Sequence, residues 1–153
     1  DAGGYPDPDH YLAEFGKRIG HPLTRQDWVA ARRAAMNPFP EVLALARRIA
    51  GQARVAIYTN NGPLAKTELH QLFPEAAEIF AERYFSFEFA TKKPDPASFR
   101  RLAAHMNVDP ADCWFIDDKK SNVQGARMAG LLGHHYRSFN QLHDEAATLG
   151  FAT

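Results

Sequence analysis

Trp114-Phe115-Ile116-Asp117-Asp118 is the stretch of sequence that decides the fold. Its apolar residues lead directly into an acidic pair, a pattern typical of a buried strand that ends at the edge of a parallel sheet. Two adjacent carboxylates both stay ionised only when a cation or strong hydrogen-bond donors lie beside them. The stretch therefore predicts a strand followed by a candidate metal site, made by Asp117 and Asp118.

Strands and helices are expected to alternate along the rest of the chain. Apolar or aromatic runs predict strands over residues 54–58, 84–89, 113–116 and 131–136, with 54–58 and 113–116 buried on both faces. Helical spacing and capping residues predict helices over residues 10–19, 24–35, 41–50, 63–72, 97–106, 121–128 and 138–150. Strands separated by such helices pair in parallel, so the expected fold class is α/β, with helices on both faces of a parallel sheet.

The segment Asn37-Pro38-Phe39-Pro40 breaks the helical pattern and marks the expected domain boundary. Residues 1–38 are expected to form part of a small helical cap, and residues 39–153 an α/β core. Thr24-x-x-Asp27 is a variant capping box that opens a helix in the cap. Trp28 in that helix is interpreted as a packing residue, with contact to a substrate as the alternative.

The polar residues with chemical potential follow the predicted strands. Thr59 and Asn60 follow one strand, Lys93 lies in the loop after the next, and Asp117 and Asp118 follow a third. Ligands of open parallel sheets bind beyond the carboxyl ends of the strands, so these side chains are expected to converge. A hydroxyl at a helix start and a lysine are suited to hold and neutralise a phosphate.

Each candidate also has an ordinary structural interpretation. Thr59-Asn60-Asn61-Gly62 is common turn and capping chemistry, and an acidic pair at a helix start interacts favourably with the helix dipole. Lys92 is expected to be a solvated loop residue, and Asn122 has two interpretations, a role in the site or stabilisation of a helix start alone. The convergence of several motifs at one sheet edge favours the functional interpretation.

In this chain order, the hydroxyl, the lysine and the acidic pair resemble motifs II, III and IV of the haloacid dehalogenase (HAD) superfamily. The resemblance implies a three-layer Rossmann-like core and phosphoryl transfer through an aspartyl-phosphate. It implies Thr59, Lys93, Asp117 and Asp118 as catalytic residues, with Thr59, Asn60 and Lys93 binding substrate. It also implies Mg²⁺ as the cofactor, bound by Asp117 and by Asp118 as the direct ligand. Asn122 matches an asparagine that is frequent in the fourth motif.

The family's first motif, a strand ending in the nucleophilic Asp-x-Asp, is not found in the sequence. Asp7-Pro8-Asp9 is rejected, because it follows Gly3-Gly4-Tyr5-Pro6 and not an apolar strand. The resemblance places the absent strand in the middle of the sheet, between those predicted at 54–58 and 113–116. We expect that the chain starts partway through a longer protein or that a partner donates the strand, and that this chain alone is inactive.

Composition narrows the function classes. The 153 residues carry a formal net charge of zero, so no electrostatic footprint for nucleic acid or an anionic membrane is expected. No apolar run approaches the roughly 20 residues that span a bilayer. The single cysteine, Cys113, fits a reducing compartment, and a cytoplasmic location is expected. His134 and His135 are adjacent, so in a strand they point to opposite faces and do not share a metal ion.

Three functions are considered. The first is a Mg²⁺-dependent phosphatase of a small phosphorylated metabolite. The second is a hydrolytic 2-haloacid dehalogenase of the same superfamily, against which the intact Asp117-Asp118 pair argues, since that reaction uses no metal. The third is a non-catalytic module that binds phosphate without a nucleophile. The oligomeric state is left open.

Overall fold

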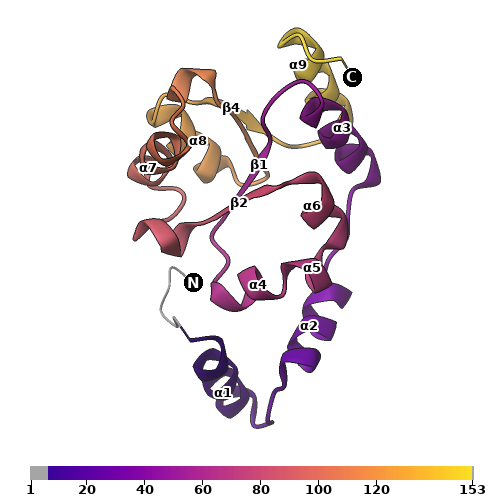
Figure 1. Ribbon diagram of the computed structural model, residues 1–153, viewed down its shortest axis with the longest axis vertical. Coiled ribbons are helices and arrows are strands. Elements are labelled where there is room, and N and C mark those ends of the chain that lie inside the picture. The colour runs from indigo at the N-terminus through magenta and orange to yellow at the C-terminus, as the bar shows by residue number, and fades with distance from the viewer. Residues whose placement is uncertain (1–6, 153) are drawn as a thin grey trace.

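The computed structural model describes residues 7–152, in which helices and strands alternate (Figure 1). The helices are α1 (Pro8–Ile19), α2 (Arg25–Ala34), α3 (Pro40–Ala50), α4 (Pro63–Thr67), α5 (Leu69–Leu72), α6 (Pro74–Ile79), α7 (Pro96–Met106), α8 (Lys120–Met128) and α9 (Phe139–Thr148). The strands are β1 (Ala56–Thr59), β2 (Glu82–Phe85), β3 (Trp114–Asp117) and β4 (Leu132–His135). Short 3₁₀ helices cover Ser86–Phe89 and Pro110–Asp112.

The four strands form two parallel pairs. β1 pairs with β2, with Ala56 opposite Glu82, and β3 pairs with β4, with Trp114 opposite Leu132. Within residues 7–152, no strand ladder joins β1 to β3. One edge of β1 and one edge of β3 are therefore left without a strand partner among the described residues.

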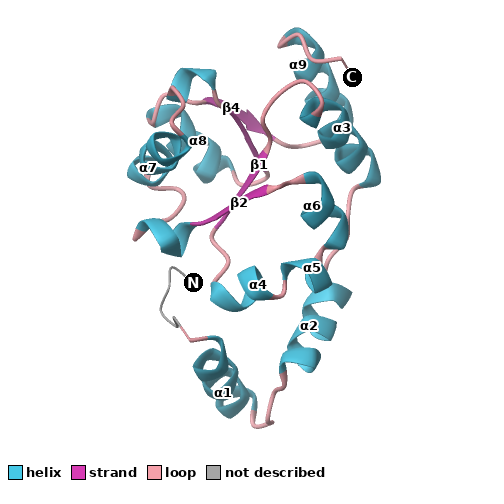
Figure 2. Cartoon of the chain, viewed as in Figure 1, coloured by secondary structure: helices cyan, strands magenta, loops and turns pink. Residues whose placement is uncertain are grey.

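Helices cover both faces of the strands, which confirms the α/β class predicted from the sequence (Figure 2). On one side, Leu45 of α3 and Leu142 of α9 belong to one buried cluster, against which Trp114 of β3 packs. On the other side, Phe99 of α7 and Ala126 of α8 form a second cluster. Figure 1 shows α7 and α8 on one side of the strands and α3 and α9 on the other.

The strands are less buried than the sequence predicts. All four residues of β1 are only partly buried, and Ile116 of β3 is 39% exposed. The apolar runs predict strands covered on both faces, and that expectation is wrong for these residues. Each pair contains only two short strands, so within the described part of the chain each pair has edges with no strand beside them, and its residues are less covered.

The N-terminal helices are stabilised by local caps and share a core with the segment after β1. Thr24 and Asp27 make the predicted capping box at the start of α2. Trp28 is buried at 7% exposure in a cluster with Leu12, Leu64 and Leu72, so its side chain packs between helices, as expected. The cap–core division at residue 38 remains a prediction, and the cluster joins α1 and α2 to α4 and α5.

Two predicted elements differ in the structure. The helix expected over residues 63–72 is divided into α4 and α5 at Glu68, whose buried carboxylate accepts hydrogen bonds from Arg25 and Gln71. The strand expected over residues 84–89 starts earlier, at Glu82, and becomes a 3₁₀ helix at Ser86. There the Glu88 carboxylate accepts a hydrogen bond from the backbone N–H of Phe85, which favours a turn over further strand. Across residues 7–152, no helix combines the length and apolar character that crossing a membrane requires.

Candidate active site

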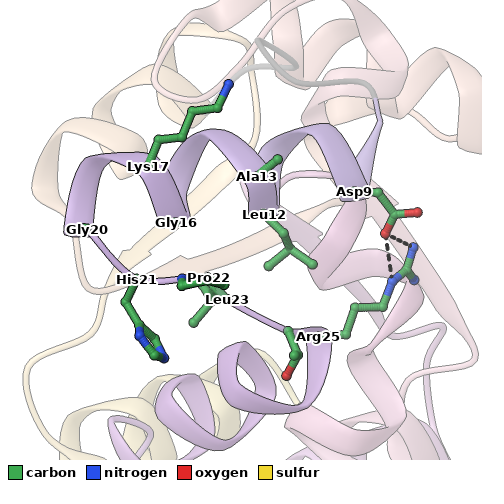
Figure 3. Close-up of a pocket in the computed structure, with 11 residues that line it drawn as sticks. Asp9, Leu12, Ala13, Gly16, Lys17, Gly20, His21, Pro22, Leu23 and Arg25 are labelled. Carbon is green, nitrogen blue, oxygen red and sulfur yellow. Dashed lines mark hydrogen bonds and ion pairs between the residues drawn. The ribbon is translucent and has the colours of Figure 1, made fainter.

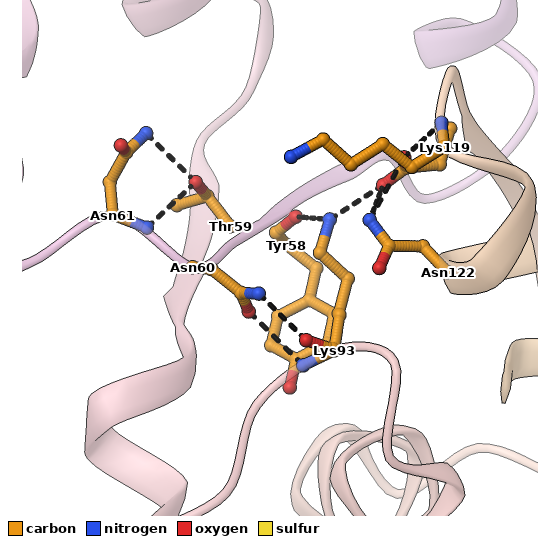
Figure 4. Close-up of polar contacts among 8 residues, drawn as sticks. Tyr58, Thr59, Asn60, Asn61, Lys93, Lys119 and Asn122 are labelled. Carbon is orange, nitrogen blue, oxygen red and sulfur yellow. Dashed lines mark hydrogen bonds and ion pairs between the residues drawn. The ribbon is translucent and has the colours of Figure 1, made fainter. Parts of the chain in front are cut away.

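The Lys93 side chain lies between the carboxyl ends of β1 and β3. Its Nζ donates a hydrogen bond to the backbone carbonyl of Tyr58 at 2.9 Å and to Asp117 Oδ2 at 2.8 Å (Figure 4). The side chains of Lys93 and Asp117 are only 9% and 8% exposed. The ammonium also lies 5.1 Å from the centroid of the Phe115 ring and 5.5 Å from that of Tyr58. A buried pair is weakly screened, so the Coulombic attraction between Lys93 and Asp117 is stronger than in a surface ion pair, and the cost of desolvating both charges offsets part of that gain.

Asn60 fixes the backbone of Lys93. Its Nδ2 donates to the Lys93 carbonyl at 2.9 Å, and its Oδ1 accepts from the Lys93 N–H at 3.1 Å (Figure 4). Both ends of the amide are therefore used in fastening the lysine loop to the end of β1. A direct contact of Asn60 with substrate remains a prediction.

Asp117 is held by donors from three directions. Besides Lys93, the backbone N–H of Lys119 donates to Oδ1 at 2.8 Å, and Asn122 Nδ2 lies 3.0 Å from both carboxylate oxygens. Burial raises the pKa of Asp117, but the hydrogen bonds from Lys93, Lys119 and Asn122 outweigh it, so the pKa lies below the usual value. Asp117 is therefore an ionised, oriented carboxylate at neutral pH.

The Lys119 contact was not predicted, although an aspartate whose side chain accepts from the N–H two residues later is a recognisable turn. The sequence offers Asn122 either a role in the site or stabilisation of the helix start, and in the structure its side-chain amide donates to Asp117. Asn122 is buried at 6% exposure, which restricts it to this internal contact.

A glycine allows α8 to approach the lysine loop. A Cβ atom at Gly125 would lie 1.9 Å from the carbonyl oxygen of Pro94, the residue after Lys93. Only a glycine permits this approach, and it brings the loop close to the helix that follows Asp117. Gly125 is thus part of what places Lys93 against Asp117.

Thr59 ends β1 with its hydroxyl engaged as an acceptor. Its Oγ1 accepts from the backbone N–H of Asn61 at 3.2 Å and from Asn61 Nδ2 at 2.9 Å (Figure 4). A hydroxyl has two acceptor lone pairs and one O–H donor. Both lone pairs of the Thr59 hydroxyl are occupied, so its only remaining hydrogen-bonding group is the O–H donor. The described residues offer no acceptor to this O–H. Among the described residues, Thr59 therefore keeps one unused O–H donor.

Asp118, unlike Asp117, is exposed. Its backbone carbonyl faces His135 Nε2 at 2.9 Å, and within residues 7–152 its carboxylate has no hydrogen bond or ion pair. No group of three His, Cys, Asp or Glu side chains that could hold a metal ion is found among the described residues. Mg²⁺ is commonly bound through one or two carboxylates, with water and substrate phosphate completing its shell. The free carboxylate of Asp118 beside the ionised Asp117 fits that mode.

Lys92, the two adjacent histidines and the single cysteine do not contribute side chains to the cluster around Lys93 and Asp117. Lys92 is exposed, as expected. His134 is buried and contacts Glu145, whereas His135 faces the Asp118 carbonyl, so the two imidazoles do not share a site. Burial and neighbouring carboxylates raise the pKa of the Cys113 thiol, which disfavours a reactive thiolate.

A hollow of about 580 Å³ lies elsewhere, between α1 and the segment that leads into α2 (Figure 3). Leu12, Gly16 and Leu23 contribute to its lining, and the ion pair of Asp9 and Arg25 lies at one side. None of the site residues predicted from the sequence lines it. Asp9, from the rejected Asp7-Pro8-Asp9 motif, is thus bound to Arg25 near the start of α1 and lies off the strands.

The fold and this site define an α/β protein with a lysine and carboxylates at the ends of parallel strands. Residues 7–130 match the family model described as haloacid dehalogenase-like hydrolase. The match covers most of the chain, so the protein belongs to the haloacid dehalogenase-like hydrolase family, which confirms the resemblance seen in its motifs.

Curated relatives include a flavin mononucleotide hydrolase of Arabidopsis thaliana, 33% identical over 72 residues, which are 44% of this chain and 29% of that protein. A phosphatase of Mycobacterium tuberculosis is 25% identical over 131 residues, which are 86% of this chain and 59% of that protein. The chain thus spans less than two thirds of the length of these two relatives.

Among solved structures, a HAD family enzyme of Bacteroides thetaiotaomicron in complex with magnesium and inorganic phosphate superposes with a TM-score of 0.73. It is 19% identical, and the superposition covers 89% of this chain and 74% of that chain. At this identity the likeness supports the fold.

Proposed function

We propose that the protein is a Mg²⁺-dependent phosphatase of a small phosphorylated metabolite. The observation that carries this proposal is the buried Lys93–Asp117 pair at the strand ends. Lys93 also contacts the backbone carbonyl of Tyr58, the residue before Thr59, whose O–H has no acceptor among the described residues. An ammonium and a hydroxyl donor at the end of the same strand suit a phosphate, whose oxygens accept hydrogen bonds and carry negative charge. Phosphatases among the relatives give further support.

Each residue then has a defined task. Thr59 donates to a phosphate oxygen, and Lys93 neutralises charge on the phosphate and on the attacking carboxylate. Asn60 holds the Lys93 backbone, and Asn122 orients Asp117. Asp118 and Asp117 would hold Mg²⁺, which when bound supplies positive charge that stabilises the transferring phosphoryl group.

The attacking aspartate would come from a further strand placed between β1 and β3, each of which has one edge without a strand partner among the described residues. A segment of the same protein or a strand from a partner would supply it. An apolar strand there would complete the backbone hydrogen bonds of both pairs.

We propose a cytoplasmic location from the lone Cys113, which suits a reducing compartment.

The test is hydrolysis of an aryl phosphate by the full-length protein, with and without Mg²⁺. Asp118→Asn should remove most of the metal-dependent rate and weaken Mg²⁺ binding, because one anionic ligand of a hard cation is lost. Asp117→Asn should do the same to a smaller degree. Unchanged Mg²⁺ affinity in both variants would defeat the metal assignment, and release of chloride from a 2-haloacid would identify a dehalogenase instead.

Residues 1–153 alone should give no turnover, because Thr59 and Lys93 can bind phosphate but do not form the covalent intermediate. Addition of a peptide with an apolar strand that ends in Asp-x-Asp should restore some activity. Hydrolysis by the chain alone at a rate that Asp117→Asn abolishes would place the nucleophile inside this sequence and overturn that part of the proposal.

A further inference from the structure

The orientation of the Asn61 amide decides whether Thr59 is a donor or an acceptor. As placed, Nδ2 donates to Thr59 Oγ1 at 2.9 Å, which leaves the hydroxyl proton free. If the amide turned over, Oδ1 would face the hydroxyl instead, and the Thr59 O–H would be consumed by donating to it. The two amide orientations have nearly the same shape, so a neighbouring group must select one.

Arg32 of α2 is that neighbouring group. Its Nη2 donates to Asn61 Oδ1 at 3.4 Å, and a guanidinium has only donors, so it selects the orientation in which the oxygen faces it. This contact joins the N-terminal helices to the turn after β1, across 29 residues of sequence.

Arg32 is itself held in position. Its guanidinium lies 5.7 Å from the centroid of the Trp28 ring, one turn earlier on α2. Trp28 is buried against Leu64 and Leu72 of the segment that follows β1. The position of Arg32 therefore depends on how α2 packs against α4 and α5.

We propose that Arg32 is a positioning residue that couples the packing of α2 to the hydrogen-bond polarity of Thr59. With α2 packed as here, Arg32 orients Asn61, and Thr59 presents its O–H to an anionic oxygen of the substrate. When α2 moves away, the amide turns freely and the donor is lost for part of the time. The coupling rests on the proposed function, since it assumes that Thr59 donates to a phosphate oxygen.

The first test is the binding of inorganic phosphate to the full-length protein, measured by calorimetry. Without the arginine, we expect the Asn61 amide to adopt the reversed orientation in half or more of the molecules. Only molecules in which Thr59 can donate bind phosphate well, so Arg32→Gln should weaken phosphate binding about two- to tenfold, in proportion to the loss of those molecules. Arg32→Lys, which keeps a donor without an acceptor, should restore part of the affinity. Arg33→Gln is the matched control, because Arg33 has the same charge on the same helix but donates to the Gln71 carbonyl at 3.2 Å.

A double-mutant cycle distinguishes the effect of Arg32 through Asn61 on Thr59 from direct attraction between the Arg32 charge and phosphate. In an Asn61→Ala background, Arg32→Gln should have no further effect on phosphate affinity, because the group that transmits the contact is gone. An undiminished effect in that background, or equal effects of Arg32→Gln and Arg33→Gln, would overturn the proposal. Failure of the wild-type protein to bind phosphate, or unchanged affinity in Thr59→Val, would instead count against the phosphate site itself.

A second measurement does not depend on phosphate. The Asn61 side-chain amide protons should show a nuclear Overhauser contact with the Thr59 methyl group in the wild type and in Arg33→Gln. In Arg32→Gln this contact should weaken or vanish. If it persists unchanged, Arg32 does not orient the amide, and the inference is refuted whatever the phosphate site does.

Discussion

Gly125→Ala should destabilise the protein and separate Lys93 from Asp117. The new methyl group would lie 1.9 Å from the Pro94 carbonyl oxygen and 2.8 Å from its carbonyl carbon. Real Cβ atoms essentially never approach closer than 3.0 Å, so α8 or the loop must shift by at least about 1.1 Å, the difference between 3.0 and 1.9 Å. The clash is with backbone, which cannot rotate away, and overpacking of this kind costs about 1 to 3 kcal/mol.

The shift has a direct effect on the site, because Pro94 follows Lys93 in the chain. If the displacement of about 1.1 Å is carried to Nζ, the 2.8 Å contact with Asp117 lengthens to about 3.9 Å. That separation lies outside hydrogen-bond range. Aryl phosphate hydrolysis should therefore fall together with stability.

Urea unfolding followed by circular dichroism measures the loss of stability. In a thermal unfolding experiment on the same 153-residue chain, a loss of 1 kcal/mol would lower the Tm by about 2 to 4 °C. Gly51→Ala is the control, because the nearest atom to its new Cβ is the Arg48 carbonyl oxygen at 3.5 Å, an ordinary contact. If Gly125→Ala unfolds at the same urea concentration as the wild type, the close packing of α8 on the Pro94 carbonyl is refuted.

Other substitutions test the fold and the site separately. Trp28→Ala should cost about 3 to 5 kcal/mol of unfolding free energy, as for a buried aromatic side chain, and a loss below 1 kcal/mol would contradict its packing role. Lys93→Ala should lower the hydrolysis rate by about 10² to 10³, whereas exposed Lys92→Ala should not; the reverse result would mean that the wrong lysine was assigned. Hydrogen bonds from Arg54 and Tyr84 lower the pKa of Glu82, so the stability that this carboxylate contributes is present above its ordinary pKa and is lost as pH falls through the lowered value. Because the pair is partly exposed, Glu82→Gln should cost no more than about 1 kcal/mol at pH 7, and this cost should shrink as the pH is lowered into the acid range; a cost that does not change with pH would exclude the ionic explanation.

Local sequence signals predicted most of the elements and the edge of the sheet at which the site lies. Apolar runs predict β1 and β3, and the rule that ligands bind beyond the strand ends predicts that Lys93 and Asp117 lie close together. The capping box of Thr24 and Asp27 located the start of α2. These signals act over a few residues, so they can be read from sequence alone.

Features that depend on tertiary contacts were not predicted. The break at Glu68 arises because its carboxylate turns inward to Arg25, which lies 43 residues earlier in the chain. The helix predicted over residues 121–128 starts at Lys120 in the structure, and its N-cap Lys119 makes no side-chain cap, because the turn is held by Asp117 instead. The close approach permitted by Gly125 has no sequence signature beyond a glycine within a helix.

The two separate strand pairs also bear on how the chain assembles. Paired residues are only 26 positions apart between β1 and β2 and 18 positions apart between β3 and β4. Contacts of such short range close early, because little loop entropy is lost in forming them. Each pair can therefore form as a local unit with its connecting helices, and the two units then dock. Since Lys93 joins the end of β1 to Asp117 at the end of β3, the residue proposed to neutralise phosphate also ties the two strand pairs to each other.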